Sequence, residues 1–156
     1  MPTSIPQVKL RKSSVVSART SHTTSWLRLL VVGTSLALVA TVANVALALA
    51  LRSWLQVPAG FQPLTPPAVA SLTIIGMIAA TVVFAWTART RPDPIRTFLV
   101  IATVGLFLSW LPDLAIWVTA VFHGTTGTGI LSLMALHVVA AACAVAILTR
   151  FGLKTS

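Results

Sequence analysis

The sequence predicts an all-α membrane protein, a bundle of four transmembrane helices with the N- and C-termini in the cytoplasm. Composition is the first observation behind this fold class: of 156 residues, 56% are hydrophobic and 8% are charged, against about 25% charged in soluble proteins. A soluble domain of this size cannot hide so much apolar surface, because part of every small globule faces water. The other two observations are four long apolar stretches and a biased distribution of basic residues.

Each apolar stretch is long enough to cross the hydrocarbon core of a bilayer, which takes about 20 helical residues. Lipid offers no partners to backbone N–H and C=O groups, so these stretches are expected to be helices, and they lack the short alternation of barrel strands. The expected spans are 26–51, 68–88, 97–121 and 129–149. They form one transmembrane domain at 26–150, between a disordered basic tail at 1–25 and a C-terminal tail at 151–156.

A cleaved signal peptide is the alternative interpretation of the first stretch, with Ala-Leu-Ala at 48–50 as the cleavage site. Its apolar region is too long, since signal peptides usually have apolar regions of roughly 7–15 residues. A membrane-spanning helix is therefore the favoured interpretation.

Lysine and arginine predict the orientation of the spans. Ten of the eleven lie before or at the start of the first span, between the second and third spans, or after the fourth, and Arg52 alone lies in another loop. The positive-inside rule places the ten on the cytoplasmic side. Their charge favours contact with the lipid bilayer rather than nucleic acid, because no nucleic-acid-binding fold accompanies it.

Cysteine and histidine give no sign of a metal or redox site. Cys143 is the only cysteine, which excludes a disulfide within the chain and a multi-cysteine zinc site. His22, His123 and His137 lie in unrelated contexts without metal-ligand spacing. No cofactor is expected.

The loop between the first two spans contains four prolines, which forbid a regular helix. Its apolar residues are expected to rest on the membrane surface or to cap the bundle: Trp54, Leu55, Phe61 and Leu64. A lid over a ligand is the sharper alternative, and nothing in the loop sequence selects it.

Polar residues inside the spans are few, and each needs a reason to be there. Counting back from the outer ends at about 1.5 Å per residue places Asn44, Asp113 and His137 about 8–12 Å below the outer boundary. Thr73 falls at a similar depth, and Ser109 lies on the same helical stripe as Asp113. These five residues form the candidate polar cluster, with no catalytic or metal-binding residue among them.

Small residues follow the same stripes, including Gly76 and Gly105, and are expected to let the helices approach closely. Pro112 is expected to bend the third helix and to free the Leu108 carbonyl, which Ser109 or water would satisfy.

The polar layer has two main interpretations. In the structural one, Asp113 and His137 share a hydrogen bond that Asn44 completes, and the layer sets the register of the bundle. In the functional one, the pair carries protons or binds a small polar ligand. A charge in lipid costs about 3 kcal/mol or more, so both require a partner for Asp113. The structural interpretation is favoured, because polar contacts between membrane helices are common. In a third, the helix ends before Asp113, which then lies in headgroup water.

Four motifs occur in order along the chain: ANVALAL, RPDPIRTF, LSWLPDL and LMALHVVAA. With them, residues 26–150 resemble an uncharacterised family of four-helix bacterial integral membrane proteins, a domain-of-unknown-function family found mainly in actinobacteria. The resemblance implies four spans in the plasma membrane of a bacterial cell and no established activity.

Three functions are weighed. The favoured one is a non-enzymatic structural or accessory membrane protein, with other membrane proteins or further copies of the chain as candidate partners. The alternative is a small transporter or proton-coupled carrier that uses Asp113 and His137. An enzyme ranks last, because no nucleophile–base pair, metal cluster or phosphate-binding loop occurs in the sequence.

Overall fold

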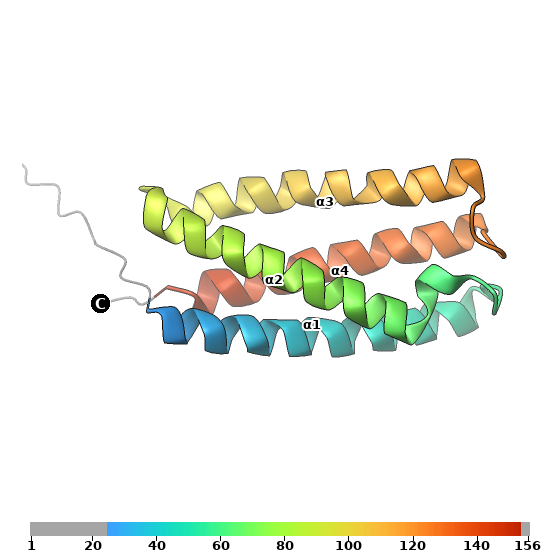
Figure 1. The fold of residues 1–156 in the computed structure, drawn as a ribbon, viewed down its shortest axis with the longest axis horizontal. Helices are drawn as coiled ribbons and strands as arrows, with labels where there is room; N and C mark the ends of the chain where they lie inside the picture. Colours follow the sequence, from blue (N-terminus) through green and yellow to red (C-terminus); the bar gives the residue numbers. More distant parts are fainter. Residues whose placement is uncertain (1–24, 154–156) are drawn as a thin grey trace, which may run out of the picture.

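The computed structural model describes residues 25–153 and contains four long helices in an antiparallel arrangement (Figure 1). The helices are α1 (Trp26–Trp54), α2 (Pro66–Thr90), α3 (Pro94–Thr119) and α4 (Gly127–Phe151), and one 3₁₀ turn, η1 (Gln62–Leu64), precedes α2. The apolar spans expected from the sequence lie within these helices, except that α3 ends before the expected limit of 121. Nearly all of the basic tail at 1–25 lies outside the described residues.

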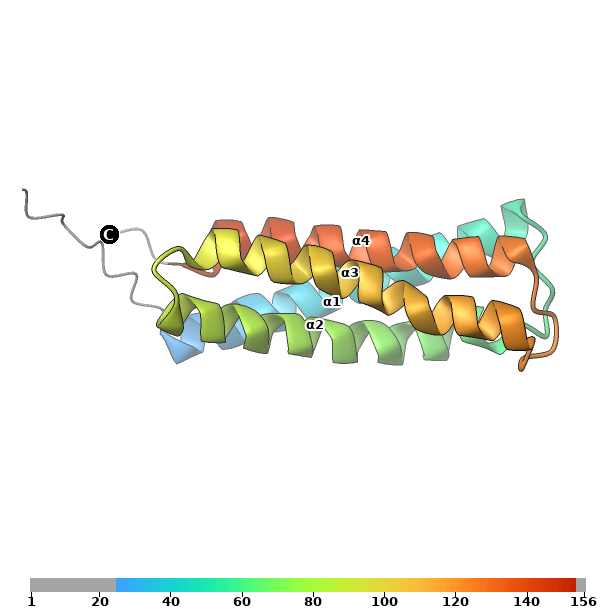
Figure 2. The ribbon, with the colours of Figure 1, turned by 90° about the horizontal axis from the view of Figure 1, so that it is seen from above.

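The helices form a bundle in which sequence neighbours lie side by side. α1 packs against α2 and α4, and α3 packs against α4 and α2, so α1 and α3 are diagonally opposed. The start of α1, the α2–α3 connection and the end of α4 share one end of the bundle, here called the near end (Figures 1 and 2). The two longer loops, 55–65 and 120–126, lie at the opposite, far end.

Local sequence explains where the helices begin. The side chains of Ser25, Asp93 and Thr126 each accept a hydrogen bond from the backbone N–H three residues later, which caps α1, α3 and α4. Proline occupies the first positions of α2 and α3, where its missing N–H costs nothing. Asp93, one of the two acidic residues in the chain, is therefore explained as a helix cap.

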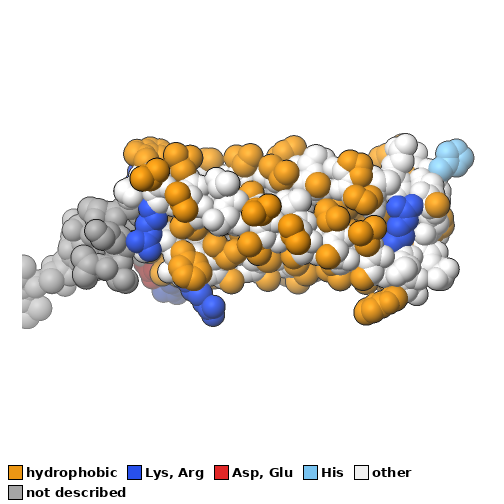
Figure 3. All heavy atoms as spheres, turned by 90° about the horizontal axis from the view of Figure 1, so that it is seen from below, with side chains coloured by type: hydrophobic (Ala, Val, Ile, Leu, Met, Phe, Trp, Pro, Cys, Tyr) orange, Lys and Arg blue, Asp and Glu red, His pale blue; other side chains and the backbone are white. Residues whose placement is uncertain are grey.

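All four helices are long and apolar enough to cross a membrane. Apolar side chains cover the middle of the bundle, and basic side chains lie near its ends (Figure 3). At the near end, the Arg89 guanidinium stacks 3.8 Å from the Trp26 ring and that of Arg91 lies 4.9 Å from the Trp86 ring. This pattern is typical of a protein whose middle lies in hydrocarbon and whose ends lie in the interfaces.

The buried apolar residues form two clusters along the bundle axis. The near cluster includes Leu36, Met77, Phe84, Phe98 and Leu148, and the far cluster includes Phe61, Leu64, Val69, Ile130 and Leu136. Asn44 on α1 lies between Ala40 of the near cluster and Ala48 of the far one, and Thr73 on α2 lies between Met77 and Val69. The polar residues therefore interrupt the core between two apolar clusters.

The apolar residues of loop 55–65 were expected either to rest on the membrane surface or to cap the bundle, and the structure contains both kinds. Phe61 and Leu64 are buried in the far cluster, whereas Trp54 and Leu55 are exposed. The Phe61 ring packs closely on Gly129, where a Cβ would lie 3.0 Å from the ring, so a larger residue there would push the ring outward by a few tenths of an ångström. The loop thus caps the far end of the bundle.

Candidate functional site

All five residues of the polar cluster expected from the sequence line one cavity of about 450 Å³, here called the polar cavity. It lies between α2, α3 and α4, with Asn44 contributed by α1. Asn44, Thr73 and Asp113 are buried, with at most 7% of each residue exposed. Four separate helices therefore contribute polar groups to the wall of one cavity.

The first polar pair joins α1 to α2. The Asn44 side-chain amide donates a hydrogen bond to the Thr73 hydroxyl over 3.0 Å. The amide oxygen of Asn44, Oδ1, has no hydrogen-bond partner within the described residues. The structural interpretation expected Asn44 to complete a hydrogen bond between Asp113 and His137. Asn44 instead bonds to Thr73.

The second polar pair joins α3 to α4. Asp113 Oδ2 lies 3.5 Å from His137 Nδ1. The same nitrogen lies 2.9 Å from the carbonyl oxygen of Leu133, one turn earlier on α4. A carbonyl only accepts hydrogen bonds, so in this contact His137 Nδ1 is the donor.

Asp113 Oδ2 and His137 Nδ1 are close enough for an ion pair but too far apart for a normal hydrogen bond. N–H donors normally lie about 2.9–3.0 Å from their acceptor. At that distance His137 Nδ1 already donates its hydrogen bond to the Leu133 carbonyl oxygen. Asp113 Oδ2 consequently finds no hydrogen-bond partner among residues 25–153. Two residues that line the polar cavity, Asn44 and Asp113, therefore each carry a buried oxygen acceptor, Oδ1 and Oδ2, without a hydrogen-bond partner among the described residues.

The structure decides two details of the third helix. The helix continues through Asp113 as far as Thr119, and Asp113 is only 4% exposed, so the alternative that the helix ends before this residue is wrong. The Ser109 hydroxyl donates to the carbonyl of Leu106 and not to that of Leu108. Ser109 thus lines the polar cavity without bonding to a neighbouring helix.

Sequence reasoning missed the apolar part of the cavity wall. Pro63 from the far-end loop, Met77, Pro112, Ile116 and Leu136 also line it. Their residue types carry no signal that separates a cavity wall from a packed core. Only Pro112 stood out, for its effect on the helix.

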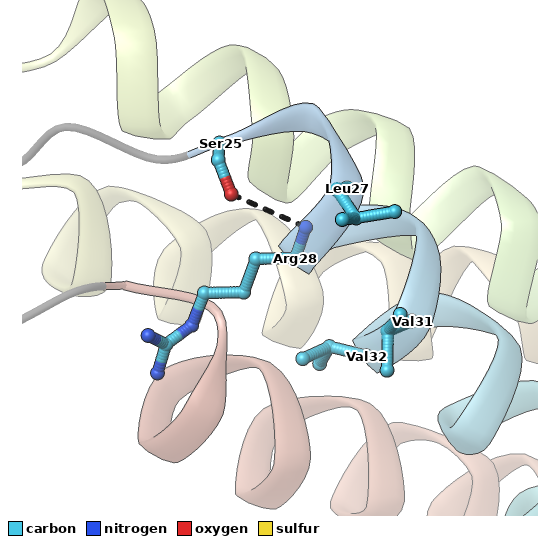
Figure 4. A pocket seen from close by; sticks show the side chains of 5 residues that line it. All are labelled: Ser25, Leu27, Arg28, Val31 and Val32. Atoms are coloured by element: carbon cyan, nitrogen blue, oxygen red, sulfur yellow. Dashed lines mark hydrogen bonds between the residues drawn. The ribbon is translucent and has the colours of Figure 1, made fainter.

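A separate hollow of about 430 Å³ lies against the first turns of α1 at the near end (Figure 4). Its lining residues are Ser25, Leu27, Arg28, Val31 and Val32, all from the start of this helix. The Arg28 guanidinium reaches the end of α4, where its Nε donates to the Phe151 carbonyl over 2.7 Å. This contact ties the first helix to the last, so we assign Arg28 a structural role.

No curated protein and no solved structure matches the chain. The sequence profile of a family of unknown function, DUF6069, matches residues 21–153, which is most of the chain and includes all four helices. The protein therefore belongs to this family of unknown function, DUF6069, as a four-helix membrane protein with a polar cavity inside its bundle.

Proposed function

We propose that this protein is a non-enzymatic membrane protein that binds a small ligand in the polar cavity and serves as an accessory component of its membrane. One observation carries the proposal: two buried acceptors in the cavity wall, Asp113 Oδ2 and Asn44 Oδ1, lack hydrogen-bond partners within the described residues. Buried polar groups are normally satisfied, and leaving one unsatisfied costs about 1–3 kcal/mol. A layer that served only to set helix register would gain nothing from two unsatisfied acceptors beside a cavity.

The size of the cavity supports this role. Ligand sites are typically about 300–1,000 Å³, mostly apolar, with a few polar groups that fix the orientation of the ligand. The polar cavity, at about 450 Å³, has this composition, with Asn44, Thr73, Asp113 and His137 set among apolar side chains.

A reactive cysteine placed in the cavity wall tests the proposal. Thr73→Cys, made in a Cys143→Ala background, is expected to react with a small maleimide in proteoliposomes, because a thiol must reach water to ionise. Ser132→Cys is the matched control: Ser132 is also buried, but it lies outside the cavity wall and bonds to Thr128. If both cysteines are equally inert, the layer is dry and structural, and the proposal fails.

A second candidate is a small transporter or proton-coupled carrier. It is favoured by the position of the Asp113–His137 pair in the cavity wall. In liposomes, Asp113→Asn and His137→Ala are expected to abolish proton or solute flux while the protein stays folded. Unaltered flux in both variants, with normal stability, contradicts this candidate.

The proposal also covers the membrane in which the protein lies and its orientation there. We place the protein in the plasma membrane of a bacterial cell, with the near end in the cytoplasm. The charge distribution supports this orientation: Arg28, Arg89, Arg91, Arg96 and Arg150 are at the near end, and Arg52 is at the far end.

A further inference from the structure

The third helix is the least buried of the four. Its buried residues are Pro94, Phe98 and Asp113, and only 6% of its most apolar stretch is buried, against 22–28% in the other helices. Near one end, Phe98 packs edge-on against Phe84 of α2, with ring centroids 5.1 Å apart. Towards the other, Asp113 faces His137. A groove of about 320 Å³ lies between these two contacts, bordered by α2, α3 and α4.

Small residues create this groove rather than close it. A Cβ added at Gly76 or at Gly105 would meet nothing within 4 Å, although both glycines line the groove. Gly33 is the contrast, because a Cβ there would lie 2.7 Å from Thr81 in the close contact between α1 and α2. The expectation that small residues bring the helices together therefore fails where α2 faces α3.

The wall of the groove is a hydrocarbon surface with one polar end. Apart from Ser109 and His137, the side chains that line it are apolar, and the Ser109 hydroxyl is bonded within its own helix. Both polar residues, together with Gly76 and Met77, also line the polar cavity. The groove and the polar cavity therefore adjoin and share part of their walls, with apolar residues along the groove and the residues with unsatisfied acceptors around the cavity.

The polar cavity opens sideways to the lipid. Leu72 and Ile75 line it and are 65% and 62% exposed on the outer surface of α2, and Pro112 is exposed on α3. A molecule dissolved in the bilayer thus has a path between α2 and α3. Loop 55–65, which caps the far end, need not move.

We propose that the groove and the adjoining polar cavity together bind a single-chain amphiphile from the bilayer. Its hydrocarbon chain lies along the groove beside Gly76 and Gly105, and its head group donates hydrogen bonds to Asp113 Oδ2 and Asn44 Oδ1. Both unsatisfied groups are acceptors, so an ammonium or hydroxyl head fits and a carboxylate head does not. The proposal rests on the ligand-binding role proposed for the polar cavity and adds the chemical class of the ligand.

Photolabelling in phosphatidylcholine nanodiscs tests the proposal, since the choline head group donates no hydrogen bond. Two twelve-carbon probes with the same diazirine-bearing chain, one a primary amine and one a carboxylic acid, are compared by mapping the labelled peptides. We expect the amine to label α2 and α3 around Gly76 and Gly105, saturably with unlabelled dodecylamine. The acid should label about tenfold less, the factor expected from one hydrogen bond to a charged group.

Matched leucine variants separate groove binding from general contact with lipid. Gly105→Leu fills open space in the groove and should abolish saturable labelling without unfolding the protein. Ala46→Leu places the same side chain on the exposed surface of α1 and should leave labelling unchanged. Asp113→Asn should remove most of the preference for the amine over the acid.

Each opposite outcome has a separate meaning. Equal saturable labelling by amine and acid overturns the proposed head-group class but leaves the cavity as a binding site. No saturable labelling, with Thr73→Cys reactive, overturns the amphiphile proposal alone. No saturable labelling, with Thr73→Cys as inert as Ser132→Cys, overturns the ligand-binding function as well.

Discussion

Asn44 and Thr73 illustrate how a buried polar residue is accommodated at the level of single side chains. The Asn44 amide nitrogen donates one hydrogen bond of 3.0 Å to the Thr73 hydroxyl on the neighbouring helix. The Asn44 amide oxygen remains without a partner among the described residues. In a membrane, where the unfolded helices also find polar partners, such bonds stabilise only modestly. The larger energetic effect is expected when one partner is removed and the other is left alone.

Removing the Thr73 hydroxyl tests this expectation. Thr73→Val keeps the shape of the side chain but leaves the Asn44 amide without its acceptor, and should lower the free energy of unfolding by about 1–2 kcal/mol. Adding Asn44→Leu removes the orphaned group and should restore much of the loss. Unfolding in mixed detergent and dodecyl sulfate micelles measures both values.

Thr81→Val is the control for this pair. Thr81 lies on the same helix, and among residues 25–153 its hydroxyl bonds only to the carbonyl of Met77 in that helix. The same chemical change should therefore cost little there. If Thr81→Val and Thr73→Val destabilise equally, the loss does not come from the bond between the helices.

At the level of elements, two glycines in membrane helices have opposite surroundings. Gly33 on α1 lies in a close contact with Thr81 on α2, whereas Gly76 on α2 faces the open groove beside α3. The four-helix bundle is therefore tightly packed along α1 and α2 and loosely packed along α3. The sequence contains both glycines without distinguishing them.

Alanine at each glycine should separate the two contacts. Gly33→Ala forces the Thr81 side chain to shift and should cost about 1–3 kcal/mol, the usual effect of overpacking. Gly76→Ala meets open space and should be neutral or stabilising by up to about 1 kcal/mol, because alanine favours the helix. Unfolding in dodecyl sulfate measures both variants.

A compensating change checks the cause. Thr81→Ser removes Cγ2, the atom nearest to the added methyl group, so Gly33→Ala with Thr81→Ser should recover most of the stability. If the double variant is as unstable as Gly33→Ala, the cost arises in α1 itself and not in its contact with α2.

The whole molecule combines an apolar exterior with a strong charge difference between its ends. One short connection joins α2 to α3 at the near end, where arginines cluster, and two longer loops lie at the far end. This difference should hold the bundle in a single orientation, because basic residues near the ends of spans resist transfer across the membrane.

Reporter fusions in a bacterial host test the orientation. Green fluorescent protein joined after residue 156 should fluoresce, because it folds in the cytoplasm. Alkaline phosphatase joined after Gly124 should be active, because it needs the oxidising side of the membrane. Active phosphatase after residue 156 would show the opposite or a dual orientation.

Much of this architecture can be predicted from the sequence because membrane folding depends on simple counts. Backbone groups in lipid must be bonded within helices, so apolar length alone predicts four spans. The rise of a helix is fixed, so residue numbers also placed Asn44, Thr73, Asp113 and His137 at a common depth, and all four line one cavity. Each conclusion uses a property of a single helix.

Tertiary structure alone decided which partners those residues have and whether the space between the helices is filled. Asn44 bonds to Thr73 and not to the Asp113–His137 pair, and Gly105 borders a groove rather than a contact. The physical reason is that helix rotation and separation depend on the sum of many weak packing contacts between helices. A shift of a few ångströms in α3 turns a closed polar layer into an open cavity while every helix, depth and charge remains the same.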